Sequence, residues 1–288
     1  MAQPARPQTA DEAPRLKEQE QPERPEGADH LEGSRKEEVP VVVSRPGHVV
    51  RLADPDEVAA SVADRVHELL AGAQESRGTA SVVLTGGSIS RKVHRGLPAQ
   101  AADLDWSNVD VWWGDERFVP TDDPERNAGQ AREDLVERVA LDASRVHQMP
   151  SSDDLSDVAA AAASYAQELR DAVVGLGPDE PWFDVLMLGI GPDGHCASLF
   201  PGRPQVTSSA DVLPVIDSPK PPPQRVSLGM TVLQRARHVI FAATGDEKAD
   251  AVARSVAGGD VVKTPSAGPR GLESTTWYVD SPAATLLD

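Results

Sequence analysis

The stretch at residues 184–195 reads Asp-Val-Leu-Met-Leu-Gly-Ile-Gly-Pro-Asp-Gly-His, and it indicates the fold class of this chain. Its first half is a short, almost wholly apolar run that ends at a glycine, which predicts a strand covered on both faces. Its second half is a glycine-rich loop that places Asp193 and His195 just beyond the end of that strand. A buried strand followed by a polar loop is typical of a parallel sheet in an α/β protein.

Similar apolar runs recur along the chain, and helical stretches separate them. Further strands are predicted at residues 82–84, 109–113, 146–147 and 239–242, with an opening strand or hairpin within residues 41–50. Helices are predicted after the cap and first-turn proline at Asp54 and Pro55, around the basic segment 91–97, and at residues 127–139, 155–174 and 247–256. This alternation indicates an α/β fold with an open, mostly parallel, doubly wound sheet and helices on both faces.

The N-terminal segment, residues 1–38, differs in composition from the rest. It is acidic and rich in Pro and Glu, with Leu16 and Leu31 as its only large aliphatic residues. Such a segment buries too little apolar surface to offset its ordering entropy, so we expect it to be disordered. A solvated extension explains it better than a partner-binding tail. Residues 39–288 are expected to form a single domain.

Composition and net charge exclude several classes of ligand and of site. The formal net charge of -18 argues against non-specific binding to nucleic acid or to anionic membranes. A phosphorylated ligand would meet the same repulsion, so its site needs clustered cations and backbone N–H donors. Cys196 is the only cysteine, which excludes an internal disulfide and a four-thiolate metal site. Without an apolar leader or a run of about 18 apolar residues, the chain is expected to be cytoplasmic.

Ligands of open α/β sheets bind beyond the carboxyl ends of the strands. After the strand at 82–84 come Thr85, Gly86, Gly87 and Ser88, where glycines permit close approach and helix N–H groups favour an anion. The alternative is a simple strand-to-helix turn.

A second polar segment, Gly114–Arg117, follows the tryptophan-rich strand at 109–113. Asp115 is a candidate to orient a substrate, and Arg117 is a candidate to neutralise an oxyanion or a phosphate. A structural network of ion pairs would explain the same residues equally well.

The third segment contains His195, whose imidazole titrates near neutrality and is a candidate general base, with Asp193 placed to fix its tautomer. The alternative is a histidine that only bonds within its loop. Lys248 lies at the start of a predicted helix, where the helix dipole disfavours a cation unless an anion is bound. The alternative for Lys248 is a solvated surface lysine.

Taken together, these segments resemble the 6-phosphogluconolactonase family of the glucosamine/galactosamine-6-phosphate isomerase superfamily. The resemblance spans most of residues 41–287, and its most specific part is the Asp-Gly-His segment followed by Ser198–Gly202. Matching segments also include residues 85–88, 114–117 with 119–120 and Asn127, 225–228 and 245–248.

The resemblance implies hydrolysis of 6-phospho-glucono-1,5-lactone to 6-phosphogluconate, a step of the oxidative pentose phosphate pathway. It implies that His195 activates water beside Asp193 and that no metal or other cofactor takes part. It also implies a functional link to glucose-6-phosphate dehydrogenase, with monomer and dimer both open. The residues it places around the phosphosugar are Gly86, Gly87, Ser88, Asp115, Arg117, Arg225 and Lys248.

The chain departs from the family pattern at three places. Ile89 and Ser90 replace the usual Thr-Pro, Cys196 stands where threonine is common, and residues 220–223 carry three consecutive prolines. We therefore expect the start of the helix after Ser88 and the approach to Arg225 to differ.

Two alternative functions are considered. A glucosamine-6-phosphate deaminase/isomerase usually has a tyrosine in place of Arg117, and Asn-Glu-Pro where this chain has Leu199–Gly202. A non-catalytic sugar-phosphate sensor needs a DNA-binding module, for which residues 1–38 have neither the helices nor the charge.

Overall fold

The computed structural model of the chain describes residues 47–100, 104–177 and 179–288, which lie within one compact unit. The expected disorder of residues 1–38 and the strand expected near residues 41–43 lie outside the described residues. No helix in the described part is long and apolar enough to cross a membrane.

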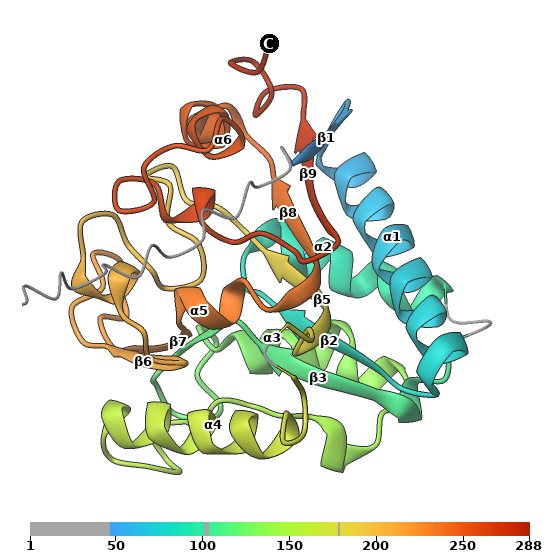
Figure 1. Cartoon of the computed structure of the whole chain (residues 1–288), viewed down its shortest axis with the longest axis vertical. Helices are drawn as coiled ribbons and strands as arrows, with labels where there is room; N and C mark the ends of the chain where they lie inside the picture. The colour runs from blue at the N-terminus through green and yellow to red at the C-terminus, as the bar shows by residue number, and fades with distance from the viewer. Residues whose placement is uncertain (1–46, 101–103, 178) are drawn as a thin grey trace, which may run out of the picture. The chain divides into compact units, whose positions relative to one another are not determined.

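Six parallel strands form the central sheet (Figure 1). In spatial order they are β1 (His48–Leu52), β9 (Ser274–Asp280), β8 (Ala236–Ala243), β5 (Phe183–Leu188), β2 (Ala80–Leu84) and β3 (Val109–Trp113). Every residue of β5 is buried, because helices cover this part of the sheet on both faces. The predicted fold class is confirmed.

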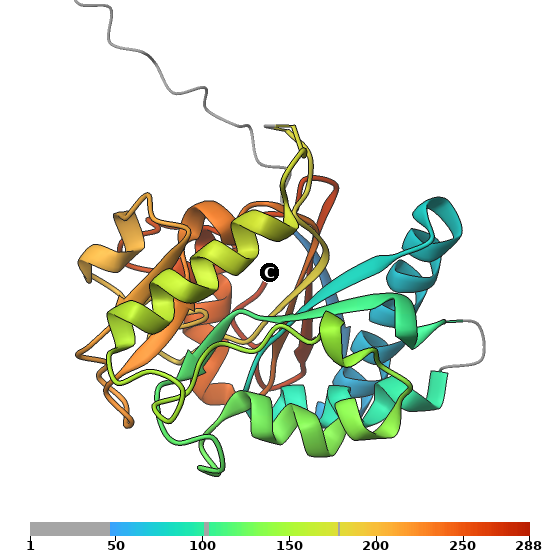
Figure 2. The ribbon, with the colours of Figure 1, turned by 90° about the horizontal axis from the view of Figure 1, so that it is seen from below.

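Helices lie on both sides of the sheet, with α1 and α2 on one side and α4 on the other (Figure 2). The α-helices are α1 (Pro55–Arg77), α2 (Ser88–Gly96), α3 (Asn127–Asp134), α4 (Val158–Ala172), α5 (Met230–Leu233) and α6 (Ala249–Val256). Short 3₁₀ turns span Leu97–Gln100, Trp106–Asn108, Val136–Arg138, Ala143–Arg145, Pro204–Thr207, Asp246–Lys248 and Pro265–Ala267. The predicted cap of α1 is confirmed, because the Asp54 side chain accepts from Asp56 N and Glu57 N.

The core joins the strands to one another and to α4. Trp277 of β9 stacks on Phe241 of β8, with ring centroids 3.8 Å apart. From α4, the fully buried Tyr165 hydroxyl lies 3.0 Å from Trp113 N, at the end of β3. This packing fixes the strand ends from which the polar loops leave.

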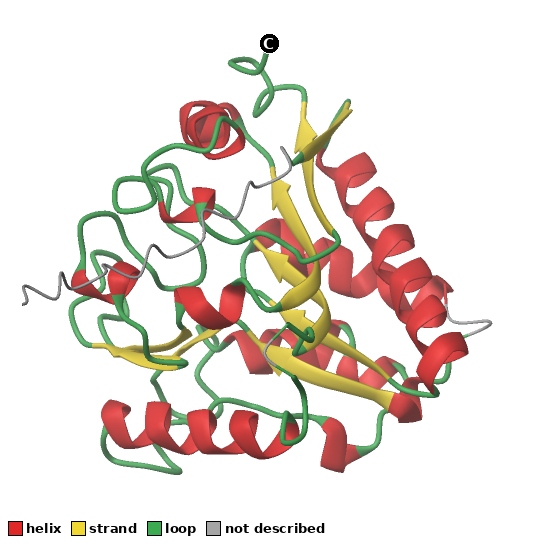
Figure 3. Cartoon of the chain, in the orientation of Figure 1, coloured by secondary structure: helices red, strands yellow, loops and turns green. Residues whose placement is uncertain are grey.

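The structure also contains a smaller antiparallel sheet, which was not predicted (Figure 3). It contains β4 (Asp115–Arg117), β7 (Arg225–Leu228) and β6 (Val212–Val215). β4 consists of three charged residues, so no apolar pattern marks it, and backbone pairing with β7 makes it a strand. β9 was missed as well.

Some predicted boundaries were wrong. α3 ends at Asp134 and not at 139, because the backbone of Leu135 leaves the helical region. α4 begins at Val158 and not at 155, because Asp157 caps it. Residues 146–147 make only an isolated bridge from Val146 to Val111. A 3₁₀ turn occupies the start of the helix predicted at 247.

Candidate active site

The loops that follow β2, β3 and β5 meet at one edge of the sheet. Gly114 N donates to Leu84 O over 2.9 Å, which ties the loop after β3 to the end of β2. A methyl group placed on Gly189, just after β5, would lie 3.9 Å from Gly86 O. The three polar segments selected from the sequence are therefore neighbours in space.

The first loop presents the N-terminus of α2. Gly87 has a φ of 105°, a conformation that favours glycine, and no side chain caps the helix start. Gly86 packs so closely against Asn127 that a methyl group added at Gly86 would lie 1.9 Å from Asn127 Oδ1. The first N–H groups of α2 thus stay available to an anion.

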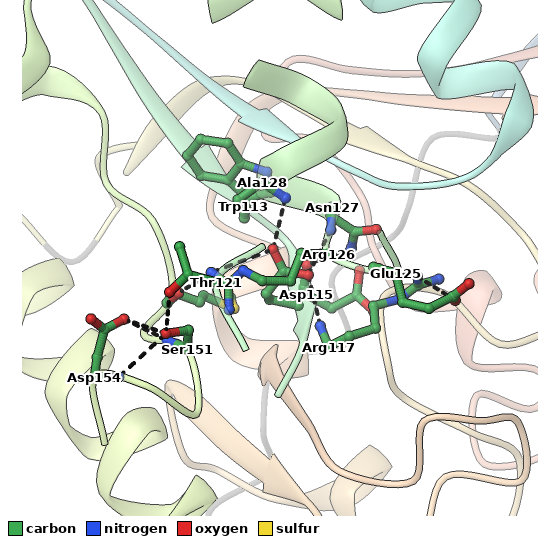
Figure 4. A network of polar contacts seen from close by, with 12 residues as sticks. Trp113, Asp115, Arg117, Thr121, Glu125, Arg126, Asn127, Ala128, Ser151 and Asp154 are labelled. Atoms are coloured by element: carbon green, nitrogen blue, oxygen red, sulfur yellow. Dashed lines mark hydrogen bonds and ion pairs between the residues drawn. The ribbon is translucent and has the colours of Figure 1, made fainter. Parts of the chain in front are cut away.

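Glu116 of β4 organises the backbone beside this loop, in the polar network where Figure 4 labels Asp115, Asn127 and Ala128. It is fully buried, and its carboxyl accepts from Asn127 N and Ala128 N, each at 2.8 Å, at the start of α3. Burial raises the pKa of Glu116, although Arg126 and the backbone donors oppose this shift. Glu116 therefore has the structural role that was the alternative interpretation of this polar segment.

Asp115 connects the second loop to the third. Its buried carboxylate accepts from Ser198 Oγ at 2.6 Å, and its carbonyl accepts from Asn127 Nδ2 at 2.9 Å. Arg117 Nη1 donates to Glu125 O at 2.6 Å, which holds the guanidinium at the end of β4. Arg117 is also the register partner of Arg225 on β7, so the two side chains leave the same face of the small sheet.

His195 and Asp193 form a hydrogen-bonded pair in the loop after β5. The distance from His195 Nδ1 to Asp193 Oδ1 is 2.5 Å. Partial burial works to raise the pKa of Asp193, but the hydrogen bond and the charge of His195 outweigh it and hold that pKa at about 2. An ionised Asp193 accepts from Nδ1–H, which leaves Nε2 as the ring nitrogen that can take up a proton.

Two glycines, Ser266 and Phe200 support this loop. A methyl group on Gly191 would lie 2.1 Å from the His195 ring, and Gly194 has a φ of 91°. Ser266 donates to Gly194 O from its N–H at 3.0 Å and from its hydroxyl at 2.8 Å. The ring of Phe200 packs against His195 with centroids 4.7 Å apart. The His195 ring is therefore held by close packing, and its loop is held by backbone hydrogen bonds.

Lys248 and Arg225 complete the predicted set. Burial lowers the pKa of Lys248, against the attraction of Glu247 and Asp280, and its ammonium has no ion pair among the described residues. The Arg225 guanidinium lies over the Phe200 ring at 5.9 Å.

Six of the predicted site residues fall into two linked groups. Gly86, Asp115, Arg117 and Arg225 are connected through Asn127, Ser198 and the paired strands, whereas Asp193 and His195 join them through Phe200. Asn127, Ser198 and Phe200 belong to matched motifs, but no role was predicted for them. Among the described residues, no cluster of His, Cys, Asp and Glu forms a metal site.

Two cavities of about 420 and 470 Å³ are lined by none of the predicted site residues. The first lies at the amino ends of the strands, against Trp112, His147 and Asp184, and the second lies beside Arg126 and Met149. Neither is lined by His195, so the site is identified by its converging polar groups and not by cavity size.

Residues 53–277 match the family described as glucosamine-6-phosphate isomerases/6-phosphogluconolactonase. The chain belongs to this family. It is 48% identical to a 6-phosphogluconolactonase of Streptomyces coelicolor over 244 residues, covering 81% of this chain and 92% of the relative. It is 44% identical to a 6-phosphogluconolactonase of Mycobacterium tuberculosis over 237 residues, covering 81% and 96%.

A solved 6-phosphogluconolactonase from Thermotoga maritima has a similar structure, with a TM-score of 0.72 and 27% identity. The similarity covers 82% of this chain and all of that one. The family resemblance predicted from the sequence is confirmed over the part of the chain that carries the site.

Proposed function

We propose that this chain is an enzyme that hydrolyses 6-phospho-glucono-1,5-lactone to 6-phosphogluconate, with His195 as the general base. The observation that carries the proposal is the Asp193–His195 pair at a strand end beside an anion-favouring helix start. The lactonase relatives and the family match support the same reaction.

The reaction begins with water bound to Nε2 of His195. As the water oxygen attacks the lactone carbonyl carbon, Nε2 takes a proton, and ionised Asp193 stabilises the imidazolium through Nδ1–H. Collapse of the tetrahedral intermediate breaks the bond from that carbon to the ring oxygen, and His195 returns its proton to this oxygen. The products are a carboxylic acid, which ionises at neutral pH, and a free hydroxyl.

Arg117 is assigned the developing oxyanion, since its guanidinium lies at the end of β4 and keeps donors beyond the one used by Glu125. Arg225 lines the same face, and Asp115 orients the substrate from its place beside Ser198. Lys248 and the backbone of Gly86, Gly87 and Ser88 bind the phosphate. A lactone is an activated ester, so this set suffices without a metal.

The pathway context belongs to the proposal as well. We place the reaction in the oxidative pentose phosphate pathway, in the cytoplasm, after the step of glucose-6-phosphate dehydrogenase.

A direct test measures proton release from freshly generated 6-phospho-glucono-1,5-lactone. We expect purified protein to accelerate release well above the uncatalysed rate. Release of ammonia from glucosamine 6-phosphate, without faster lactone hydrolysis, would assign the chain to the deaminase branch of the family.

A further inference from the structure

The peptide unit between Gly194 and His195 is held on both sides. On one side, Gly194 O accepts from Ser266 N at 3.0 Å and from Ser266 Oγ at 2.8 Å. On the other side, His195 N donates to Asp193 Oδ1 at 3.3 Å. Because a peptide unit is planar, holding its two ends fixes the direction in which the His195 side chain leaves the backbone. Ser266 therefore helps to aim the proposed base.

The loop after β5 has little regular secondary structure to support it. β5 ends at Leu188, and the next helix or strand of the described chain is the 3₁₀ turn that begins at Pro204. Gly194 has a φ of 91°, and a methyl group added there would lie 3.0 Å from Thr264 Cγ2. The turn at Pro265–Ala267 thus holds this part of the loop through close packing and hydrogen bonds.

Ser255 of α6 extends this support. Its Oγ lies 2.6 Å from Ser266 Oγ and 2.7 Å from Ala251 O, and both serines are fully buried. Together with the contact from Ser266 Oγ to Gly194 O, these three contacts share only two hydroxyl hydrogens. When Ser266 gives its hydrogen to Gly194 O, the short contact between the two hydroxyl oxygens requires Ser255 to donate to Ser266. Ala251 O has a backbone donor within α6 and does not need that hydrogen.

We propose that Ser255 and Ser266 form a chain of two buried hydroxyl groups that positions His195 for catalysis. Ser255 donates to Ser266, and Ser266 donates to Gly194 O. Both serines are positioning residues, since they act through the backbone and not on the reacting atoms. The inference rests on the proposed function, and it matters to the rate because a misplacement of about 1 Å at a catalytic group can cost about 10²-fold.

Steady-state hydrolysis of 6-phospho-glucono-1,5-lactone by Ser266→Ala, Ser255→Ala and the double variant tests the chain of hydroxyl groups. Ser266→Ala keeps the backbone bond to Gly194 O but loses the hydroxyl bond, so kcat should fall about ten- to hundredfold while KM stays within about twofold. Ser255→Ala should lower kcat less. Because Ser255 acts only through Ser266, the double variant should have the kcat of Ser266→Ala within about twofold.

Ser151→Ala is the matched control for the loss of a buried serine. Ser151 is fully buried, and its hydroxyl bonds to Asp154 at 2.7 Å and to Thr121 at 2.8 Å. Urea unfolding should show that this variant is destabilised, whereas its kcat should equal that of the wild type. The proposal is overturned by an unchanged kcat in folded Ser266→Ala, by an equal fall in Ser151→Ala, or by a further fall in the double variant. If Ser266→Ala does not fold, an unchanged kcat in Ser255→Ala overturns it.

Nitrogen-15 spectra of the imidazole groups test the same chain without turnover. At a pH that leaves the ring neutral, the His195 signals, assigned by their loss in His195→Ala, should show hydrogen on Nδ1 alone, as the contact with Asp193 requires. Ser266→Ala should shift these signals towards a mixture of tautomers, and Ser151→Ala should not. If wild-type protein does not accelerate lactone hydrolysis, the proposed function fails. The spectra then decide the role of Ser266, and unchanged His195 signals in Ser266→Ala would refute it.

Discussion

Gly86→Ala is expected to disrupt the contact that joins the first two loops of the site. The added methyl carbon would lie 1.9 Å from Asn127 Oδ1, whereas ordinary contacts begin at about 3.4 Å. The Asn127 amide must therefore move by about 1.5 Å, which breaks its 2.9 Å bond to Asp115 O. Overpacking and one lost buried bond together should cost about 2–5 kcal/mol.

Urea unfolding and steady-state hydrolysis of the lactone measure this effect. We expect Gly86→Ala to lower the unfolding free energy by that amount and to lower kcat/KM. The double variant Gly86→Ala/Asn127→Ala removes the clashing amide, so it should be more stable than Gly86→Ala alone. The reasoning is refuted if Gly86→Ala has wild-type stability, or if Asn127→Ala adds its full cost to the double variant.

Three further predictions concern other parts of the structure. Asp193→Asn removes the acceptor that holds Nδ1–H of His195, so kcat should fall by about 10²-fold or more while KM stays similar. Steady-state kinetics measure both constants, and an unchanged kcat would contradict this role of Asp193. Ser198→Ala leaves the buried Asp115 carboxylate without its 2.6 Å donor and should cost about 1–3 kcal/mol in urea unfolding, whereas a neutral result would show that the contact is unimportant. His147 is partly desolvated, but its hydrogen bonds to Asp110 and Glu168 outweigh this and raise its pKa. The stabilisation from protonated His147 is therefore full below about pH 6.5 and is lost as pH rises through the higher pKa of the folded state. Urea unfolding between about pH 6 and 9 should show a decline in stability that the His147→Gln variant lacks.

The parallel sheet could be predicted because its strands are marked by apolar runs. Val82–Leu84, Val109–Trp113 and Asp184–Leu188 all lie in the main sheet, and their polar loops meet as expected. The small sheet could not be predicted, because Asp115–Arg117 becomes a strand only through pairing with residues more than a hundred positions away. Local pattern contains no information about such a partner.

Predictions about individual side chains were limited in the same way. The sequence placed Asp193 beside His195 because they are two residues apart, and the structure forms that contact. The contacts of Asn127 and Ser198 with Asp115 depend on how separate loops fold against each other.

The central claim is that His195 acts as the base of a phosphosugar lactonase, and one comparison of rates tests it most directly. Proton release from freshly generated 6-phospho-glucono-1,5-lactone should be fast with wild-type protein and slower by about 10²–10⁴-fold with His195→Ala, while phosphate affinity stays nearly unchanged. A His195→Ala variant that retains the wild-type rate would contradict the claim.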